Sequence, residues 1–199
     1  GGSTGEEAYS IAILLREHMP RMQQAPKLQI FASDIDERSL QIARTGRFPS
    51  TIAKDVPNER LERYFVREDG TYRIASELRE ICLFSPHNLL RDAPFSNLDL
   101  ITCRNLLIYL TPELQNRLVP LLHYALNDGG YLFLGTSENV TRHSRLFSTV
   151  DKAHRLFKRR PQIERRLPEF PLTAPESRRQ TGDAPRTTRR VVNVVCQAE

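Results

Sequence analysis

Two polar side chains, Arg104 and Asn105, directly follow a stretch that has the composition of a buried strand. This stretch, Asp99 to Cys103, contains the β-branched residues Ile and Thr in an apolar run, which suits a sheet covered on both faces. Ligands of open α/β sheets bind at the carboxyl ends of the strands. The pair therefore indicates a pocket wall, although a turn that satisfies its own polar groups explains the spacing equally well.

Two further strand-like stretches are also followed by polar residues. Asp34 closes the stretch Leu28 to Asp34, and Asn88 follows the stretch Ile81 to Ser85. An acidic side chain in the position of Asp34 commonly accepts hydrogen bonds from ribose hydroxyls. Asp36 stands instead directly before a helix-like segment, where it is more simply an N-cap. We therefore assign a ligand to Asp34 and a helix cap to Asp36.

A glycine-rich turn, Gly1 to Gly5, leads into the paired glutamates Glu6 and Glu7. In a purely structural interpretation, Ser3 or Thr4 caps the following helix and a glutamate completes a capping box. As a ligand loop, the turn suits a cation, because two carboxylates at a helix start repel a phosphate. S-adenosylmethionine carries an ammonium and a sulfonium and has no phosphate, so it fits this turn better than a dinucleotide does.

The elements that must position these residues alternate along the chain. The strand-like stretches, the last of them Tyr131 to Gly135, are separated by helix-like segments at Glu6 to His18, Glu37 to Thr45 and Pro112 to Leu126. Such alternation predicts a parallel sheet in a doubly wound α/β domain. Pro120 is expected to kink the last of these helices.

An insertion at about residues 47–80 breaks this alternation. Residues 57–65 have the pattern of a short helix, and residues 64–66 and 72–74 have that of a β-hairpin around an Asp-Gly turn. We interpret the insertion as a small β-subdomain. Such a subdomain either recognises a macromolecule or covers a sheet edge, and the pattern leaves both roles open.

The net charge of +5 is unevenly distributed along the chain. Residues 160–199 hold eight arginines and five acidic residues, a balance of +3 that leaves +2 for residues 1–159. A nucleic-acid-binding domain needs a concentrated basic face, so we expect no nucleic-acid partner. We interpret residues 1–159 as the domain and residues 160–199 as a disordered basic tail. Within this tail, the apolar run from Val191 to Cys196 is also compatible with the start of another element.

The three cysteines, Cys82, Cys103 and Cys196, have neither the spacing of metal ligands nor that of a redox pair. An odd and scattered set of thiols is typical of a reducing compartment, so we expect a cytoplasmic protein without a metal. The sequence contains no apolar run of 18 residues, and we therefore expect no membrane insertion.

Five motifs, in this order, resemble the CheR family, the chemotaxis receptor protein-glutamate O-methyltransferases. They are Ser-Thr-Gly-Glu-Glu-Ala-Tyr-Ser at 3–10, Ala-Ser-Asp-Ile-Asp at 32–36, Pro-His-Asn-Leu-Leu at 86–90, Cys-Arg-Asn-Leu-Leu-Ile-Tyr at 103–109 and Gly-Gly-Tyr-Leu-Phe-Leu-Gly-Thr-Ser-Glu at 129–138. The resemblance covers Ser3 to Arg159. The residues of these motifs are most similar to those of family members that are fused to methylesterase, PAS and histidine kinase modules in larger sensory proteins.

The resemblance implies a Rossmann-like sheet that binds S-adenosylmethionine and methylates glutamates on the cytoplasmic helical domain of a chemoreceptor. It also implies a role for seven residues. These are Glu6 at the methionyl part of the cofactor, Asp34 at the ribose, Asn88 and Leu89 at the adenine end, Arg104 and Asn105 along the pocket wall, and Tyr109 beside the methyl-transfer site. Arg104 and Tyr109 would orient the substrate glutamate and are the candidate catalytic residues.

The chain lacks a strand before Gly1 and the helical domain that the resemblance would place upstream. We therefore expect the flanking strands to keep unpaired backbone groups, and the chain alone to be inactive. The hairpin turn is shorter than in members of the family that dock a receptor peptide, which disfavours such docking here. Two alternatives remain open: a module that binds S-adenosylmethionine or its product without turnover, and a nucleotide-dependent oxidoreductase, which the paired glutamates disfavour.

Overall fold

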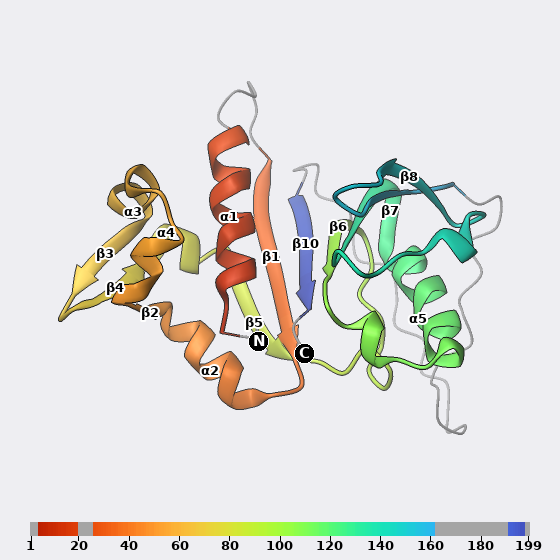
Figure 1. Cartoon of the computed structure of the whole chain (residues 1–199), viewed down its shortest axis with the longest axis horizontal. Coiled ribbons are helices and arrows are strands. Elements are labelled where there is room, and N and C mark those ends of the chain that lie inside the picture. Colours follow the sequence, from red (N-terminus) through yellow and green to blue (C-terminus); the bar gives the residue numbers. More distant parts are fainter. Residues whose placement is uncertain (1–3, 20–25, 162–190, 198–199) are drawn as a thin grey trace.

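The computed structural model of the chain describes residues 4–19, 26–161 and 191–197, the last of these as backbone. It is a mixed α/β structure with a seven-stranded sheet in the order β5-β1-β10-β6-β7-β9-β8 and a three-stranded sheet in the order β2-β4-β3 (Figure 1). The large sheet consists of β1 (Lys27–Asp34), β5 (Cys82–Pro86), β6 (Leu98–Cys103), β7 (Leu126–Leu134), β8 (Phe147–Asp151), β9 (Leu156–Arg159) and β10 (Val191–Gln197).

The helices lie close to where the hydrophobic pattern places them. They are α1 (Glu6–His18), α2 (Glu37–Thr45), α3 (Asn58–Tyr64), α4 (Ser76–Arg79) and α5 (Pro112–Ala125), with short 3-10 turns η2 (Ser50–Lys54), η3 (Leu107–Tyr109) and η4 (Thr141–His143). The predicted bounds of α1 and α2 are confirmed, and α5 ends one residue earlier than predicted. Its predicted kink at Pro120 stays a prediction. None of the described helices is long and apolar enough to cross a membrane.

Neighbouring strands from β5 to β7 run parallel, whereas β9 is antiparallel to both β7 and β8. The parallel sheet predicted from the alternation of elements is thus confirmed. Because β5, β1, β10, β6 and β7 share one direction, the turns that follow them meet at a single edge. This edge is where the candidate site residues of β1 and β6 are found.

Strand β10, from the far end of the chain, lies between β1 and β6 (Figure 1). Its residue Val194 pairs with Ile30 of β1 on one side and with Leu100 of β6 on the other. The expectation that β1 and β6 would keep unpaired backbone groups is therefore wrong, because β10 takes up both ladders. The further element left open at Val191 to Cys196 is observed as β10, so the tail interpreted as disordered contains a strand at 191–197, while the predicted linker at 162–190 lies outside the described residues.

The turn before α1 differs from the predicted capping box. Gly5 is the N-cap, with φ 97°, and no side chain caps the helix, whereas the hydroxyl of Thr4 donates to the carboxylate of Glu6 at 2.6 Å. An N-cap that accepts from the helix start requires an extended backbone, and the left-handed conformation of Gly5 does not supply one. A Cβ at Gly5 would lie 3.1 Å from Ala43 and from the ring of Tyr9, so only glycine fits this close approach.

The inserted residues form a separate sheet, whose hairpin is β3 (Phe65–Glu68) and β4 (Thr71–Ile74), with β2 (Arg47–Pro49) as a third strand. The predicted hairpin is confirmed. Its turn residues Asp69 and Gly70 both have positive φ, as a two-residue type I′ turn requires. The sheet lies at one end of the molecule, beyond α1 (Figure 1). Its extent as a domain stays a prediction.

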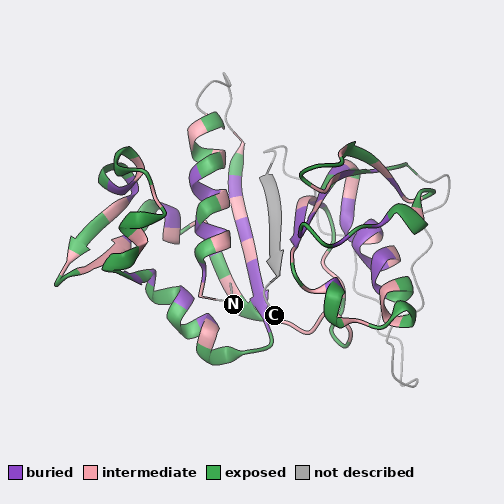
Figure 2. Cartoon of the chain, in the orientation of Figure 1, coloured by how far each residue is buried: buried purple, intermediate pink, exposed green. Residues whose placement is uncertain are grey.

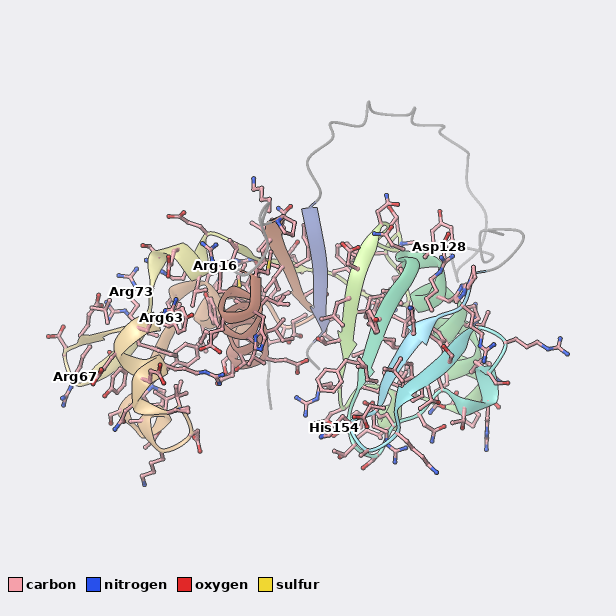
Figure 3. All side chains as sticks on the ribbon, turned by 90° about the horizontal axis from the view of Figure 1, so that it is seen from above. Arg16, Arg63, Arg67, Arg73, Asp128 and His154 are labelled. Carbon is pink, nitrogen blue, oxygen red and sulfur yellow. The ribbon has the colours of Figure 1, made fainter. Side chains whose placement is uncertain are left out.

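The arginines of this small sheet do not form a uniformly basic face. Arg47 and Arg73 both pair with Glu68, at 2.8 and 3.7 Å. Figure 3 shows Arg63, Arg67 and Arg73 gathered at this end of the molecule, far from Asp128 and His154 at the other end. Since an acidic side chain lies between two of the basic ones, the local field is weaker than the number of arginines suggests.

Two clusters of buried apolar residues form the core. Figure 2 shows buried residues on α1 and β1 as well as on α5 and β7. One joins α1, β1 and β5 to the small sheet, for example through the edge-to-face contact of Tyr9 with Phe48. The other joins β6, β7 and β9 to α5. The candidate site lies at the carboxyl edge of the sheet, where the two parts of the molecule meet.

Candidate functional site

Asp34, at the end of β1, is 2% exposed and holds the turn that follows it. Its Oδ1 accepts from the backbone N–H of Asp36 at 2.8 Å, and its carbonyl oxygen accepts from the N–H of His87 at 3.1 Å. Asp36 caps α2 by accepting from the N–H of Arg38 at 3.1 Å. The predicted cap is confirmed. The ribose contact of Asp34 stays a prediction, now for a carboxylate that is fixed in place.

The two glutamates at the start of α1 have different surroundings. Glu6 is exposed and accepts from Thr4. Glu7 lies instead beside β6, with its Oε2 3.7 Å from Nη1 of Arg104. Its Oε1 is buried and has no hydrogen-bond partner among the described residues. The cofactor contact that the resemblance implies for Glu6 stays a prediction. Glu7 received no role in the sequence, because nothing in the spacing distinguishes two adjacent carboxylates on a first helical turn.

Burial raises the pKa of Glu7 above its ordinary value of 4.5. A hydrogen bond with the fully buried Thr102 and the charge of Arg104 lower that pKa, while the nearby Glu138 raises it further. A carboxylate that is desolvated and only loosely paired gains from a bound cation, because the cation favours its charged form. Glu7 is therefore suited to accept from an ammonium group.

Arg104, the residue after β6, stacks its guanidinium over the ring of Phe133, with 5.3 Å from Cζ to the ring centroid. Its Nε is buried and lacks a hydrogen-bond partner among the described residues. The 3.7 Å separation from Glu7 is too long for a close ion pair. Arg104 thus keeps donor capacity directed at the sheet edge, which supports the predicted pocket wall.

A buried carboxylate, Glu138, holds the turn after β6. It is 3% exposed and accepts from the backbone N–H groups of Asn105 at 2.9 Å, Leu107 at 2.6 Å and Gly135 at 2.7 Å. Hydrogen bonds to an ionised acceptor are stronger than neutral ones, and three of them fix two loops together. Glu138 was part of a motif in the sequence but received no role there, because two of its three partners, Asn105 and Leu107, are far along the chain.

Gly135 leaves the space that this arrangement needs. A Cβ at this position would lie 2.6 Å from Oδ1 of Asn105 and 2.7 Å from Oε2 of Glu138. Asn105 itself has φ 59°, a left-handed conformation that asparagine tolerates better than most residues. The turn after β6 therefore depends on the residue types at both positions.

The remaining predicted residues lie around this centre without contacting Glu7. Oδ1 of Asn88 accepts from the N–H of Leu90 at 3.0 Å, which makes a local turn. Leu89 is half-buried against the β6–β7 cluster. Tyr109 is 68% exposed, in η3. The structure thus brings Glu7, Thr102 and Arg104 together, and it leaves Glu6, Asn88 and Tyr109 outside that contact.

Two buried polar atoms that lack hydrogen-bond partners among the described residues fit one end of S-adenosylmethionine. The buried Oε1 of Glu7 is an acceptor without a donor, and the buried Nε of Arg104 is a donor without an acceptor among the described residues. An amino acid end group, with its ammonium and carboxylate, complements both. The described residues hold no cluster of three or more His, Cys, Asp or Glu that could bind a metal.

The sheet is parallel from β5 to β7, and Glu7 lies opposite Arg104 at its carboxyl edge. This arrangement defines an α/β domain of the class that binds cofactors at that edge. A comparison with protein families matches residues 1–156 to the family described as CheR methyltransferase, SAM binding domain. The chain belongs to this family. The resemblance inferred from the five motifs is confirmed, and S-adenosylmethionine is the cofactor that the family binds.

Named relatives support this assignment. The chain is 42% identical over 149 residues to chemotaxis protein methyltransferase 2 of Vibrio cholerae, and 38% identical over 160 residues to the chemotaxis protein methyltransferase of Escherichia coli. Each match covers 73% of this chain, and the chain spans about half of each relative, 51% and 52%. A 104.1 kDa protein of Rhodobacter capsulatus is 45% identical over 157 residues, which are 79% of this chain and 16% of that protein.

Proposed function

We propose that this chain is the methyl-transferring domain of a protein-glutamate O-methyltransferase that acts on chemoreceptor-like signalling proteins. The observation that carries the proposal is the buried, unmatched oxygen of Glu7 opposite Arg104 at the carboxyl edge, in a chain of the CheR family. A cationic amino acid end group fits these two side chains, whereas a pyrophosphate would be repelled by Glu7. The nucleotide-dependent oxidoreductase is therefore disfavoured.

The cofactor pocket has contributions from both sides of β10. Glu7 accepts from the ammonium, a role that its burial favours over the exposed Glu6 first predicted for the methionyl part. Asp34 binds the ribose, and Asn88 and Leu89 flank the adenine end. Arg104 and Asn105 line the wall. The strand order, with central parallel strands and an antiparallel β9, agrees with a Rossmann-like methyltransferase sheet.

The chain's own residues act in the reaction by position and charge. S-adenosylmethionine supplies a methyl group on a sulfonium. The substrate glutamate is ionised at neutral pH and would accept this methyl group without a general base, with S-adenosylhomocysteine as the product. Both charges are neutralised, so a pocket of low polarity favours this step. Arg104 and Tyr109 orient the carboxylate, and such positioning supplies on the order of 7–11 kcal/mol in favourable cases.

The proposal also concerns the compartment of the protein and the modules that accompany this domain. We expect a cytoplasmic protein in which methylesterase, PAS or kinase modules accompany this domain, and in which residues 1–159 form the catalytic unit. A likeness to a much larger relative supports such a fusion, since the matched part is 16% of the Rhodobacter capsulatus protein. No nucleic acid or membrane insertion enters the proposed role.

One observation favours a second candidate function. Tyr109 is 68% exposed, and its side chain forms no hydrogen bond or ring contact with another described residue, so the methyl-transfer side of the pocket is less organised than the methionyl side. A domain that binds the cofactor without turnover would have this character. It would tether or regulate a sensory complex through its ligand.

The test is transfer of tritiated methyl groups from S-adenosylmethionine to chemoreceptor membranes by the whole protein. Carboxyl methyl esters hydrolyse in alkali, so the expected label is released as volatile methanol. Membranes without chemoreceptors are the blank, and Tyr109→Ala is the variant expected to lose most of the transfer while it still binds S-adenosylhomocysteine. Label that resists alkali would show another acceptor, and binding without any transfer would favour the non-catalytic candidate.

A further inference from the structure

A cavity of about 330 Å³ opens beside η3, on the other side of the turn that follows β6. Its walls come from η3, from the first half of α5, from the segment between β7 and η4 and from η4 itself, and they include neither Glu7 nor Arg104. Pockets for small molecules commonly measure about 300–1,000 Å³. A cavity at the lower limit of that range accommodates one or two side chains rather than a second cofactor.

The inner polar groups of this cavity are already satisfied. The carboxylate of Glu138 accepts from three backbone N–H groups. Nε2 of Gln115 donates to the carbonyl oxygens of Leu107 at 2.9 Å and Leu110 at 3.1 Å. The carboxylate of Glu138 thus has its hydrogen bonds satisfied by the backbone, and it is 3% exposed, so it offers a ligand little surface. A ligand is therefore recognised by the outer residues of the cavity.

The outer residues offer hydrogen-bond donors and one charge. Arg142 is exposed and makes no hydrogen bond or ion pair with another described residue. Asn116 and Ser137 are exposed beside it. Burial lowers the pKa of His143, so its ring is neutral at neutral pH. One uncompensated cation among neutral polar groups favours an anionic partner.

The position of the cavity relates it to the proposed methyl transfer. Ile108, in its wall, is 51% exposed, and the next residue in η3 is Tyr109, which is 68% exposed. A polypeptide that presents a glutamate to Tyr109 therefore passes the cavity within one or two residues. The methyl-accepting glutamate is ionised at neutral pH before the transfer, so the substrate brings negative charge to this place, which complements Arg142.

We propose that this cavity docks an acidic side chain of the substrate protein close to the methyl-accepting glutamate, with Arg142 as its charge partner. The inference rests on the proposed function, since the occupant is a segment of the substrate. It adds a specificity site to the domain, and this site is separate from the cofactor pocket. Its apolar wall, which includes Leu107 and Val119, contacts the aliphatic part of the docked side chain.

Charge reversal at Arg142 tests the proposal in the whole protein. With chemoreceptor membranes, we expect Arg142→Glu to raise KM by on the order of tenfold at low salt, with kcat and the affinity for S-adenosylhomocysteine changed by less than about twofold. Arg145→Glu is the matched control, because Arg145 is exposed on the same segment and does not line the cavity. The KM of the wild type should rise with salt, and that of Arg142→Glu should not.

A second measurement separates docking from turnover. Fluorescence anisotropy of a labelled helix-forming peptide with adjacent glutamate pairs should show binding to the wild type and to Arg145→Glu, and about tenfold weaker binding to Arg142→Glu. Equal affinities of the two variants, or no binding to the wild type, would overturn the docking site. Binding that depends on Arg142, without any methyl transfer by the wild type, would leave the docking site and overturn the proposed function instead.

Discussion

The turns that follow β1 and β6 reach the same edge of the sheet, but they are held there in different ways. The turn after β1 is held locally, since Asp34 and Asp36 each accept from a backbone N–H two residues further along the chain. The turn after β6 is held by Glu138, which is 33 residues from Asn105 and 31 residues from Leu107. One half of the pocket is therefore fixed by neighbours in sequence, and the other half by a distant carboxylate.

This difference has consequences for function. A locally held turn keeps its shape when distant parts of the sheet change, because its hydrogen bonds remain. A turn held by Glu138 depends on the segment after β7, which also forms the wall of the cavity beside Arg142. Changes in that segment should therefore affect Arg104 and Asn105 and leave Asp34 unaffected.

The largest effect is expected from Glu138→Gln. The amide keeps one acceptor oxygen but directs its own N–H₂ at a backbone donor, so one buried N–H is left unsatisfied and the charge assistance is lost. We expect the free energy of unfolding to fall by about 3 kcal/mol in urea denaturation. Glu62→Gln, on an exposed residue of α3, should change it by less than about 0.5 kcal/mol. Equal stability of the two variants would contradict the role given to Glu138.

Gly135→Ala should have the next largest effect. The new Cβ would lie 2.6 Å from Oδ1 of Asn105, and inserting a methyl group into such a packed site costs about 1–3 kcal/mol. The affinity for S-adenosylhomocysteine should fall with it, because the turn after β6 must shift. Gly70→Ala is the control: its Cβ meets nothing within 4 Å, so it costs only about 1 kcal/mol for the positive φ and leaves the affinity unchanged.

The pH dependence of binding separates Glu7 from Glu6. Burial raises the pKa of Glu7 above 4.5, and only the ionised form accepts from the ligand's ammonium. The affinity for S-adenosylhomocysteine should therefore be constant well above that raised pKa and fall as the pH drops through it, by at most about tenfold per pH unit for one proton. Calorimetry at a series of pH values should show this loss in the wild type and in Glu6→Gln. Retention of the pH dependence in Glu7→Gln would assign it to another group.

The smallest effect is expected from Asp36→Ala. It removes the cap of α2, in which Asp36 accepts from the N–H of Arg38 and the hydroxyl of Ser39. Loss of such a cap lowers the free energy of unfolding by about 1 kcal/mol. Asp36 is fully exposed, so we expect little change in ligand affinity. If Asp36→Ala lost ligand affinity and kept its thermal stability, the ligand contact would belong to Asp36 and not to Asp34.

The difference between local contacts and contacts over a long distance in sequence also explains which parts of the structure were predicted from the sequence. The cap at Asp36 and the turn at Asp69 and Gly70 each follow from the chemistry of adjacent residues, and both are observed. The contact of Glu7 with Arg104, and the hydrogen bonds of Glu138, join residues that are distant in sequence. No local pattern contains such information.

The central position of β10 is the clearest case. Its apolar run is compatible with a strand, but the choice of β1 and β6 as its neighbours depends on the vacancy between those two strands in the sheet. Strands β8 and β9 were also missed, because short antiparallel strands at a sheet edge have weak patterns. Long-range pairing is thus where the sequence-based interpretation failed.

Calorimetric titration of the whole protein with S-adenosylhomocysteine tests most sharply whether the turns after β1 and β6 both contribute to one cofactor pocket. We predict binding by the wild type, none of NAD, and a loss of about 1–3 kcal/mol, or roughly five- to 150-fold in Kd, for Asp34→Ala and for Arg104→Ala alike. Asp36→Ala, in the turn after β1, and Arg117→Ala, on an exposed position of α5 beyond the turn after β6, are the controls and should bind as the wild type does. Unchanged affinity in either Asp34→Ala or Arg104→Ala would contradict a pocket built from both turns.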